Sequence, residues 1–173
     1  MKLTFKNDTF KILQIADTQE GRKVSPDTLA LISAALDREE PDLVVYSGDQ
    51  IWGRGFHGDV SQVRRVLKEL TAPVVERHLP FAICFGNHDR QVGLDNRAQF
   101  EIYKEIPGFI GEDTPGVDGV GNCVLEIADG DRPGYLLYLI DSHSSLKVGY
   151  DHVHQNQIDW YRGVRDSYEK QYG

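Results

Sequence analysis

The stretch FAICFGNHDR, residues 81–90, runs five apolar residues into a glycine and then sets an amide, an imidazole and a carboxylate side by side. The apolar run is typical of a short buried strand, and Gly86-Asn87 is a pair that favours a turn. The polar group has two interpretations. Asn87, His88 and Asp89 are either a solvated turn or part of a site at the end of the strand, and the surrounding sequence has to distinguish them.

Two earlier segments of the chain end in the same manner. Residues 11–15 (KILQI) form a predicted strand that stops just before Asp17, and residues 42–47 (DLVVYS) form another that leads into a Gly-Asp pair. Each segment lies one strand–helix–strand unit from the next. Parallel strands joined by right-handed crossovers place their carboxyl ends along one sheet edge, so we expect Asp17, Asp49 and the polar group after residue 85 to converge.

Apolar residues at helical spacing predict four helices in the chain. The first follows Ser25, an N-cap that precedes a proline and an early acid, and the others lie around residues 60–70, 100–106 and 158–168. Proline removes a backbone donor and crowds the preceding turn, so Pro73 is expected to end or kink the second helix.

Two strand-like segments, residues 123–128 and 135–140, are separated by the turn sequence DGDRPG and predict a β-hairpin. The chain contains no internal repeat, low-complexity tract or linker in its sequence. Strands that alternate with helices indicate βαβ units. We therefore predict a single domain over residues 1–173, of the α/β class, with mixed sheets.

The charge balance excludes some partners and favours others. The chain has 27 acidic and 19 basic residues and a net charge of −8, which repels extended nucleic acid and favours a divalent cation. No segment approaches the roughly 20 apolar residues of a membrane span. The N-terminal stretch lacks a continuous apolar block, so a cytoplasmic location is expected. Cys84 and Cys123 lie in apolar runs and are expected to fill space in the core.

The polar strand ends favour the site interpretation of residues 81–90. Two carboxylates and an amide oxygen brought together repel one another and are costly to desolvate unless a cation lies among them. Oxygen donors of this kind suit divalent ions, and Mn²⁺, Fe or Zn²⁺ are the candidates. A metal site explains all three strand ends, whereas a turn explains each of them separately.

The motifs D-x-Q at residues 17–19, G-D at 48–49 and G-N-H-D at 86–89 together resemble the metallophosphoesterases, the calcineurin-like phosphoesterase superfamily. Residues 137–143 (LYLIDSH) and 149–161 add a likeness to bacterial members of purple-acid-phosphatase type. The resemblance implies an αββα sandwich with a dinuclear metal site. It also implies hydrolysis of a phosphomonoester or phosphodiester by a metal-activated water.

The resemblance also implies a role for each motif residue. Asp17 would bind the first metal, Asp49 would bridge both metals and Asn87 would bind the second. His88 would lie beside the scissile phosphate and would be oriented by Asp89. Catalysis by His88 would then be proton donation to the leaving group or stabilisation of developing charge.

The sequence departs from the family pattern in two places. Gln19 stands where the family has a histidine, and its amide is a weaker ligand than imidazole. The further histidines of the pattern would follow Gly173, so we expect a domain that lacks the C-terminal part of the family fold, with metal weakly bound or absent. His152 and His154 have the spacing of a substitute pair, but the favoured interpretation is a solvated loop before a helix that starts at Gln155.

His57, in a Gly-rich loop, and His143, after a predicted strand, are the remaining candidates for substrate contact. The leading hypothesis is a phosphoesterase that acts on a phosphate ester, and the alternative is an impaired or inactive module with a structural or interaction role. A nucleotide-binding domain is disfavoured because the first strand is not followed by a G-x-G-x-x-G or Walker-type loop. Exposed strand edges in residues 120–141 are expected to make a homo-oligomer.

Overall fold

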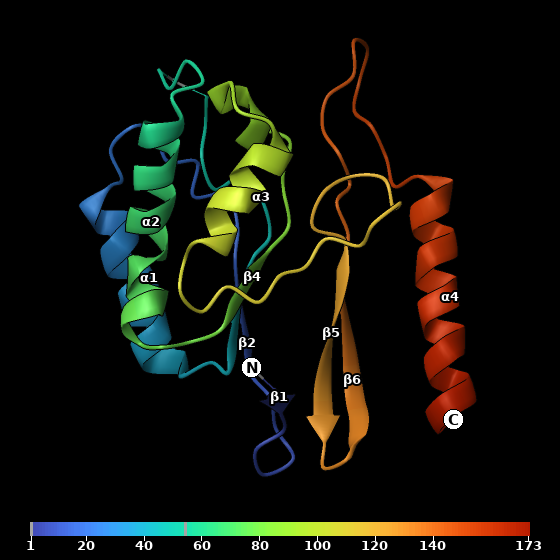
Figure 1. Cartoon of the computed structure of the whole chain (residues 1–173). Helices are drawn as coiled ribbons and strands as arrows, with labels where there is room; N and C mark the ends of the chain where they lie inside the picture. The colour runs from blue at the N-terminus through green and yellow to red at the C-terminus, as the bar shows by residue number, and fades with distance from the viewer. Residues whose placement is uncertain (1, 54) are drawn as a thin grey trace.

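Two sheets lie face to face at the centre of the fold, and helices cover both outer faces (Figure 1). The computed structural model describes residues 2–53 and 55–173. Within these residues, three helices pack against the outer face of one sheet, and the C-terminal helix lies beside the other sheet. The predicted αββα sandwich of the α/β class is confirmed.

The first sheet consists of β2 (Ile12–Ile15), β3 (Leu43–Tyr46) and β4 (Phe81–Ile83), in that order and all parallel. The connections are the predicted βαβ units, with α1 (Pro26–Glu39) after β2 and α2 (Val60–Glu76) after β3. Every residue of β3 is buried, as expected for a central strand covered on both faces. The carboxyl ends of the three strands therefore meet at one edge.

Local capping explains where α1 begins. Ser25 caps α1, and its hydroxyl accepts a hydrogen bond from the Asp27 backbone N–H. An end of α2 at Pro73, one of the two expected outcomes, is wrong, because the helix continues to Glu76. Pro73 and Val74 are both buried, and this packing outweighs the hydrogen bond that the proline cannot make.

Two helical segments follow β4. A short 3₁₀ helix, η1 (Asp89–Val92), continues directly from the polar turn, and α3 (Asn96–Lys104) covers the sheet beside α2. Aromatic rings fill the space beneath α3, where Tyr103 and Phe109 stack with centroids 6.0 Å apart. This core holds the polar turn after β4 against the rest of the sheet.

The second sheet has the order β1-β5-β6. β5 (Cys123–Asp129) and β6 (Arg132–Leu139) form the predicted hairpin, and the two-residue strand β1 (Leu3–Thr4) pairs parallel with β5. The turn is shorter than the predicted DGDRPG because β6 begins at Arg132. Sequence analysis missed β1, since two residues carry no detectable periodicity.

A second apolar core joins the two sheets. It contains Leu43, Val45 and Ala82 from the first sheet and Ile127 and Leu139 from the second. Both cysteines belong to this region and are free, as predicted for thiols that fill space. Burial raises the pKa of Cys84 to about 12 and that of Cys123 to about 11, so both thiols stay protonated at neutral pH.

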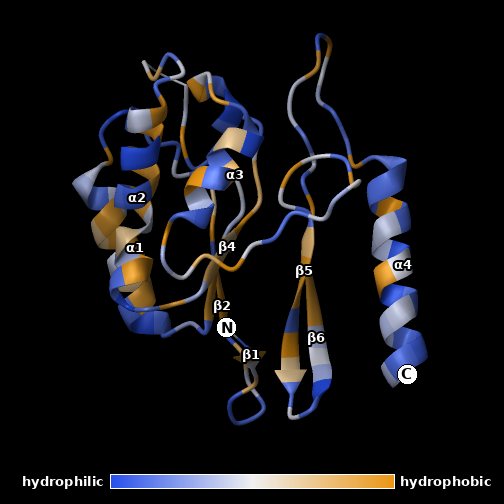
Figure 2. Cartoon of the chain, viewed as in Figure 1, coloured by the Kyte–Doolittle hydropathy of each residue, from blue (hydrophilic) through white to orange (hydrophobic). Residues whose placement is uncertain are grey.

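The other face of the hairpin lies against α4 (Gln155–Tyr172), and this helix starts where the sequence predicted. Tyr138 of β6 packs edge-on against Trp160 and Tyr161, with centroid distances of 6.0 and 4.8 Å. Figure 2 shows that α4 is mostly hydrophilic, whereas the strands, which lie between the two outer layers of helices, are more hydrophobic. Among the described residues, no helix has the length and apolar character needed to cross a membrane.

Candidate metal and phosphoester site

A cavity of about 430 Å³ opens at the carboxyl edge of the parallel sheet. Asp17, Asp49 and Asn87 line it from the ends of β2, β3 and β4, and His143 and Asp151 line it from the connection between β6 and α4. The three strand-end side chains thus reach one space, as the topology required.

The backbone at these strand ends is held in an unusual conformation. Asp17 and Asp49 have left-handed φ values of 56° and 55°, which non-glycine residues adopt rarely. Asp17 N–H donates to the Gly48 carbonyl at 3.0 Å, and Gln19 N–H donates to the Asp49 carbonyl at 2.9 Å. Strained residues of this kind persist where the surrounding structure fixes them, and they are common at functional sites.

Glycine is required where the ends of β3 and β4 approach. Gly48 has a φ of 106°, and a Cβ on it would lie 2.6 Å from the Gly86 nitrogen. A Cβ on Gly86 would clash with the Asp49 carboxylate. The glycines of the G-D and G-N-H-D motifs therefore let the two loops pack directly against one another.

Asp89 is a buried anchor for both loops. Its carboxylate accepts hydrogen bonds from the backbone N–H groups of Gly86, Asp49, Gln50 and Ile51, at 2.7, 2.8, 2.8 and 3.2 Å. Burial raises the pKa of Asp89, and the four backbone donors oppose that shift. Its carboxylate hydrogen bonds within the described residues go to backbone amides and not to His88, so its observed contacts position Asp49 instead of the imidazole.

His88 lies beside the cavity and contributes to it through its backbone. Its N–H donates to Asp49 Oδ1 at 2.7 Å, which fixes the direction of that carboxylate. The imidazole packs against the Trp52 ring with centroids 5.7 Å apart, and it is not among the cavity-lining side chains of the described residues. His88 Nδ1 is buried without a hydrogen-bond partner in the described structure, an uncommon state for a polar atom.

Two other predicted residues do not reach the cavity. Gln19 is exposed with a left-handed φ of 47°, and it is absent from the cavity lining of the described residues. His57 is also exposed, in the loop before α2, and it too lies outside that lining. Both side chains therefore face solvent, and both residues have a left-handed φ.

His143 does line the cavity, together with the unpredicted Asp151. His152 is exposed, as expected for a solvated loop, but His154 is not solvated in that way: its ring nitrogens lie 2.8 Å from Asp118 Oδ2 and 3.2 Å from Asp151 Oδ1. No sequence pattern pointed to Asp118, which is distant in the chain. A pairing between two loops depends on how the loops pack.

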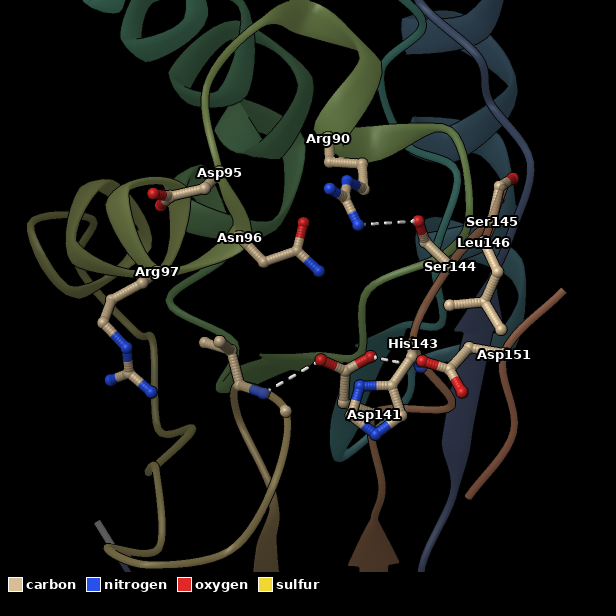
Figure 3. Close-up of a pocket in the computed structure, with 12 residues that line it drawn as sticks. Arg90, Asp95, Asn96, Arg97, Asp141, His143, Ser144, Ser145, Leu146 and Asp151 are labelled. Carbon is tan, nitrogen blue, oxygen red and sulfur yellow. Dashed lines mark hydrogen bonds between the residues drawn. The ribbon is translucent and has the colours of Figure 1, made fainter. Parts of the chain in front are cut away.

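A second cavity, of about 300 Å³, adjoins the first and shares His143 and Asp151 with it. Figure 3 shows Arg90 and Asn96 pointing into this space, and Arg90 Nη1 donates to Ser144 Oγ at 3.2 Å. Arg90 ends the quoted stretch 81–90, yet its cationic side chain was not singled out from the sequence. It is the nearest neighbour in sequence to the G-N-H-D motif that offers a positive charge to an anion.

The donors at the strand ends fit a divalent cation. Two carboxylates and an amide oxygen are the ligand types of Mn²⁺-like ions, and Zn²⁺ or Fe also accept carboxylates. The residues that would hold such an ion are Asp17, Asp49 and Asn87. The nearby His88 Nδ1, buried and unpartnered, is a further polar atom at this edge that internal hydrogen bonds do not explain.

Comparison with known sequences identifies the family. Residues 10–171 match the family described as calcineurin-like phosphoesterase. The matched segment is nearly the whole chain and contains all three strand-end motifs. The chain belongs to the calcineurin-like phosphoesterase family.

Several curated proteins are similar to the chain. Phosphatase DCR2 of Saccharomyces cerevisiae is 31% identical over 91% of the chain and 32% of its own length. A probable inactive purple acid phosphatase 14 of Arabidopsis thaliana is 28% identical over 92% of the chain and 48% of its own length. Phosphodiesterase YaeI of Escherichia coli is 36% identical over 54% of the chain and 34% of its own length. The chain therefore spans less than half the length of these relatives.

Proposed function

We propose that the chain is a metal-dependent phosphoesterase that hydrolyses a phosphomonoester or a phosphodiester in the cavity at the strand ends. The observation that carries the proposal is the meeting of Asp17, Asp49 and Asn87 in one cavity, in a chain of this family. The proposed cofactors are divalent ions, Mn²⁺, Fe or Zn²⁺. Ions bound there would supply a nucleophile from water at neutral pH and neutralise phosphoryl charge.

The chain's own residues would prepare the site in three ways. Asp17, Asp49 and Asn87 would hold the cation through oxygen donors. Asp89 and the His88 backbone would keep Asp49 in place, since both hydrogen-bond the loop that carries it. The buried Nδ1 of His88 makes this ring our candidate for moving a proton to the leaving group, after a rotation toward the cavity.

Substrate contacts are proposed at the rim of the cavity. His143 lies between the two cavities and Arg90 faces the second, so both are placed to meet a phosphate ester that extends beyond the strand ends. His57 is a weaker candidate, because it lies outside both linings in the described structure. A cationic guanidinium pairs well with phosphate oxygens.

The experiment compares the chain with Asp49→Asn, using p-nitrophenyl phosphate and bis(p-nitrophenyl) phosphate in the presence of Mn²⁺. We expect the substitution to lower kcat/KM by more than about 100-fold, because loss of a ligand exceeds the usual cost of disturbing its supporting residues. Asp8→Asn is the matched control, since Asp8 is an exposed loop residue outside the cavity lining. Equal activity in Asp49→Asn and the unchanged chain would contradict the proposal.

An impaired or inactive module is the second candidate. The specific observation in its favour is Gln19, whose exposed side chain lies outside the cavity lining and leaves the first metal position without an imidazole from this motif. Two further Arabidopsis thaliana relatives carry the description probable inactive purple acid phosphatase. Absence of hydrolysis of either substrate with Mn²⁺, Fe²⁺ or Zn²⁺, in a folded chain, would favour this candidate.

We also propose that residues 1–173 form one phosphoesterase domain, with a cytoplasmic location, and that it self-associates through β6. β1 covers part of one edge of β5. β6 pairs with β5 on one side and, within the described residues, is the edge strand of the sheet on the other. Tyr135 on β6 is 57% exposed. Light scattering at micromolar concentration tests this association, and a stable monomer would exclude it.

A further inference from the structure

Two imidazoles and a carboxylate gather in the connection between β6 and α4. One ligand atom from each of His143, Asp151 and His154 lies within 4.8 Å of the others. The two imidazole rings stack with centroids 4.1 Å apart. Two nitrogen donors and one carboxylate form a ligand set that suits zinc-like transition metals better than Mg²⁺ or Ca²⁺.

A buried glutamine fixes the tautomer of His143. Gln157 is fully buried, and its Nε2 donates to Asn122 Oδ1 at 2.9 Å and to the Asp141 carbonyl at 2.7 Å. Its Oε1 is therefore the acceptor that lies 3.1 Å from His143 Nε2, so the imidazole carries its proton on Nε2. The lone pair of His143 is then on Nδ1, which has no hydrogen-bond partner in the described part of the chain.

His154 is supported in a similar way. Its Nδ1 lies 2.8 Å from Asp118 Oδ2, and a carboxylate that accepts the second N–H of an imidazole is the usual outer partner of a metal-bound histidine. Its Nε2 lies 3.2 Å from Asp151 Oδ1, where the nitrogen and oxygen share one proton in the absence of metal. A cation bound between these two atoms takes the place of that proton.

An ion-pair interpretation accounts for part of this arrangement. A protonated His154 between Asp118 and Asp151 explains the contacts of that ring. It does not explain why Gln157 holds His143 against the same ring with an unpartnered lone pair. A metal ion uses the donors of all three side chains.

The geometry also allows the donors to close on an ion. Tetrahedral zinc with bonds of about 2.0–2.1 Å places its donor atoms about 3.3 Å apart, so the three side chains have to draw together. One imidazole also has to turn out of the stack, because a ring nitrogen binds metal in the plane of its ring. Residues 145–150 between two of them are all exposed, and this connection projects from the body of the fold (Figure 1). Its movement therefore disturbs little packing.

We propose that His143, Asp151 and His154 bind one Zn²⁺-like transition-metal ion, with water in the fourth position. His143 and Asp151 also line the cavity that Asp17, Asp49 and Asn87 line, so an ion held by them would lie at its wall. Figure 3 shows His143 and Asp151 as neighbours at the wall of the second cavity, which adjoins the first. The site does not require the proposed phosphoesterase activity, because its ligands are separate from the strand-end donors. With the ion bound, both ring nitrogens of His143 are in use, and substrate contact at this rim falls to Arg90.

The experiment measures Zn²⁺ binding by calorimetry, and the absorption spectrum of Co²⁺ as a stand-in, on a chain that carries Asp17→Asn and Asp49→Asn. These substitutions weaken the strand-end group and leave the proposed ligands intact. We expect one bound ion per chain and a tetrahedral Co²⁺ spectrum. Absence of binding in this background would overturn the proposal.

Ligand substitutions in the same background then locate the ion. His143→Ala and His154→Ala should each weaken Zn²⁺ binding by at least about tenfold, and Asp118→Asn should weaken it by about tenfold through the outer partner. His78→Ala is the matched control, because His78 is exposed and makes no contact with the cluster, and its substitution should leave affinity unchanged. Circular dichroism verifies that each variant is folded.

Two outcomes would overturn the assignment of ligands. Unchanged affinity in a folded His143→Ala chain would exclude His143 as a ligand. An equal loss in His78→Ala and His154→Ala would indicate binding by histidines in general, without the fixed cluster.

Discussion

The cavity has two walls that are built differently. The strand-end wall carries Asp17, Asp49 and Asn87 on loops that backbone hydrogen bonds and glycine contacts hold tightly. The loop wall carries His143 and Asp151 on a connection with an exposed tip, and a buried side-chain network beneath it supplies the order. Backbone topology positions the first wall, whereas one glutamine and its partners position the second.

The largest loss of stability is expected from a substitution that removes the hydrogen bonds of the strand-end wall. Replacing Asp89 by Ala leaves four backbone N–H groups, three of them buried, without their acceptor, so we expect a loss of roughly 3–5 kcal/mol in the free energy of unfolding. Urea denaturation followed by circular dichroism measures it. Asp89→Asn keeps one oxygen acceptor and should lose less. A loss below about 1 kcal/mol for Asp89→Ala would mean that these loops are held by other contacts.

A smaller effect is expected at the loop wall. Gln157→Ala removes two donors and one acceptor from a buried network, and we expect a loss of about 2 kcal/mol in the free energy of unfolding. Gln155→Ala on the same helix is the matched control, with an expected change within about 0.5 kcal/mol because Gln155 is exposed. Equal losses in the two variants would show that the network does not order this wall.

A substitution at the N-cap of α1 tests how much this helix, which follows β2, stabilises the strand-end wall. Ser25→Ala removes the hydroxyl that accepts the Asp27 N–H, and we expect a loss of about 1 kcal/mol in the free energy of unfolding. Thermal unfolding measures the change, and Ser25→Asp, which restores an acceptor at the cap, should recover most of it. No recovery in Ser25→Asp would assign the loss to another contact of the serine.

The smallest effect is expected at the tip of the loop wall. Val148 is 90% exposed, so Val148→Ser should change the free energy of unfolding by less than about 0.5 kcal/mol. The same urea titration measures it. A clear destabilisation would mean that the tip packs against something in solution, such as a second copy of the chain, and would sharpen the question of association.

The family resemblance and the fold followed from local signals. Strand ends that carry the D-x-Q, G-D and G-N-H-D motifs, the cap at Ser25 and the hairpin of β5 and β6 were all legible in sequence. The continuation of α2 through Pro73 could not be predicted from the sequence, because burial of the neighbouring turn outweighs the proline's local preference. Gln19 occupies the motif position where the family has a histidine, and the structure leaves its side chain exposed.

The sequence by itself determined which residues stand at the strand ends, since parallel βαβ topology leaves one edge for them to meet. The tertiary structure alone decided that Asp89 bonds four backbone amides, and that His154 meets Asp118 across two loops. Strand periodicity repeats along the chain and is visible in sequence. A pairing between loops has no such repeat, because it depends on the packing of the two sheets and α4, which sets where each loop begins and ends.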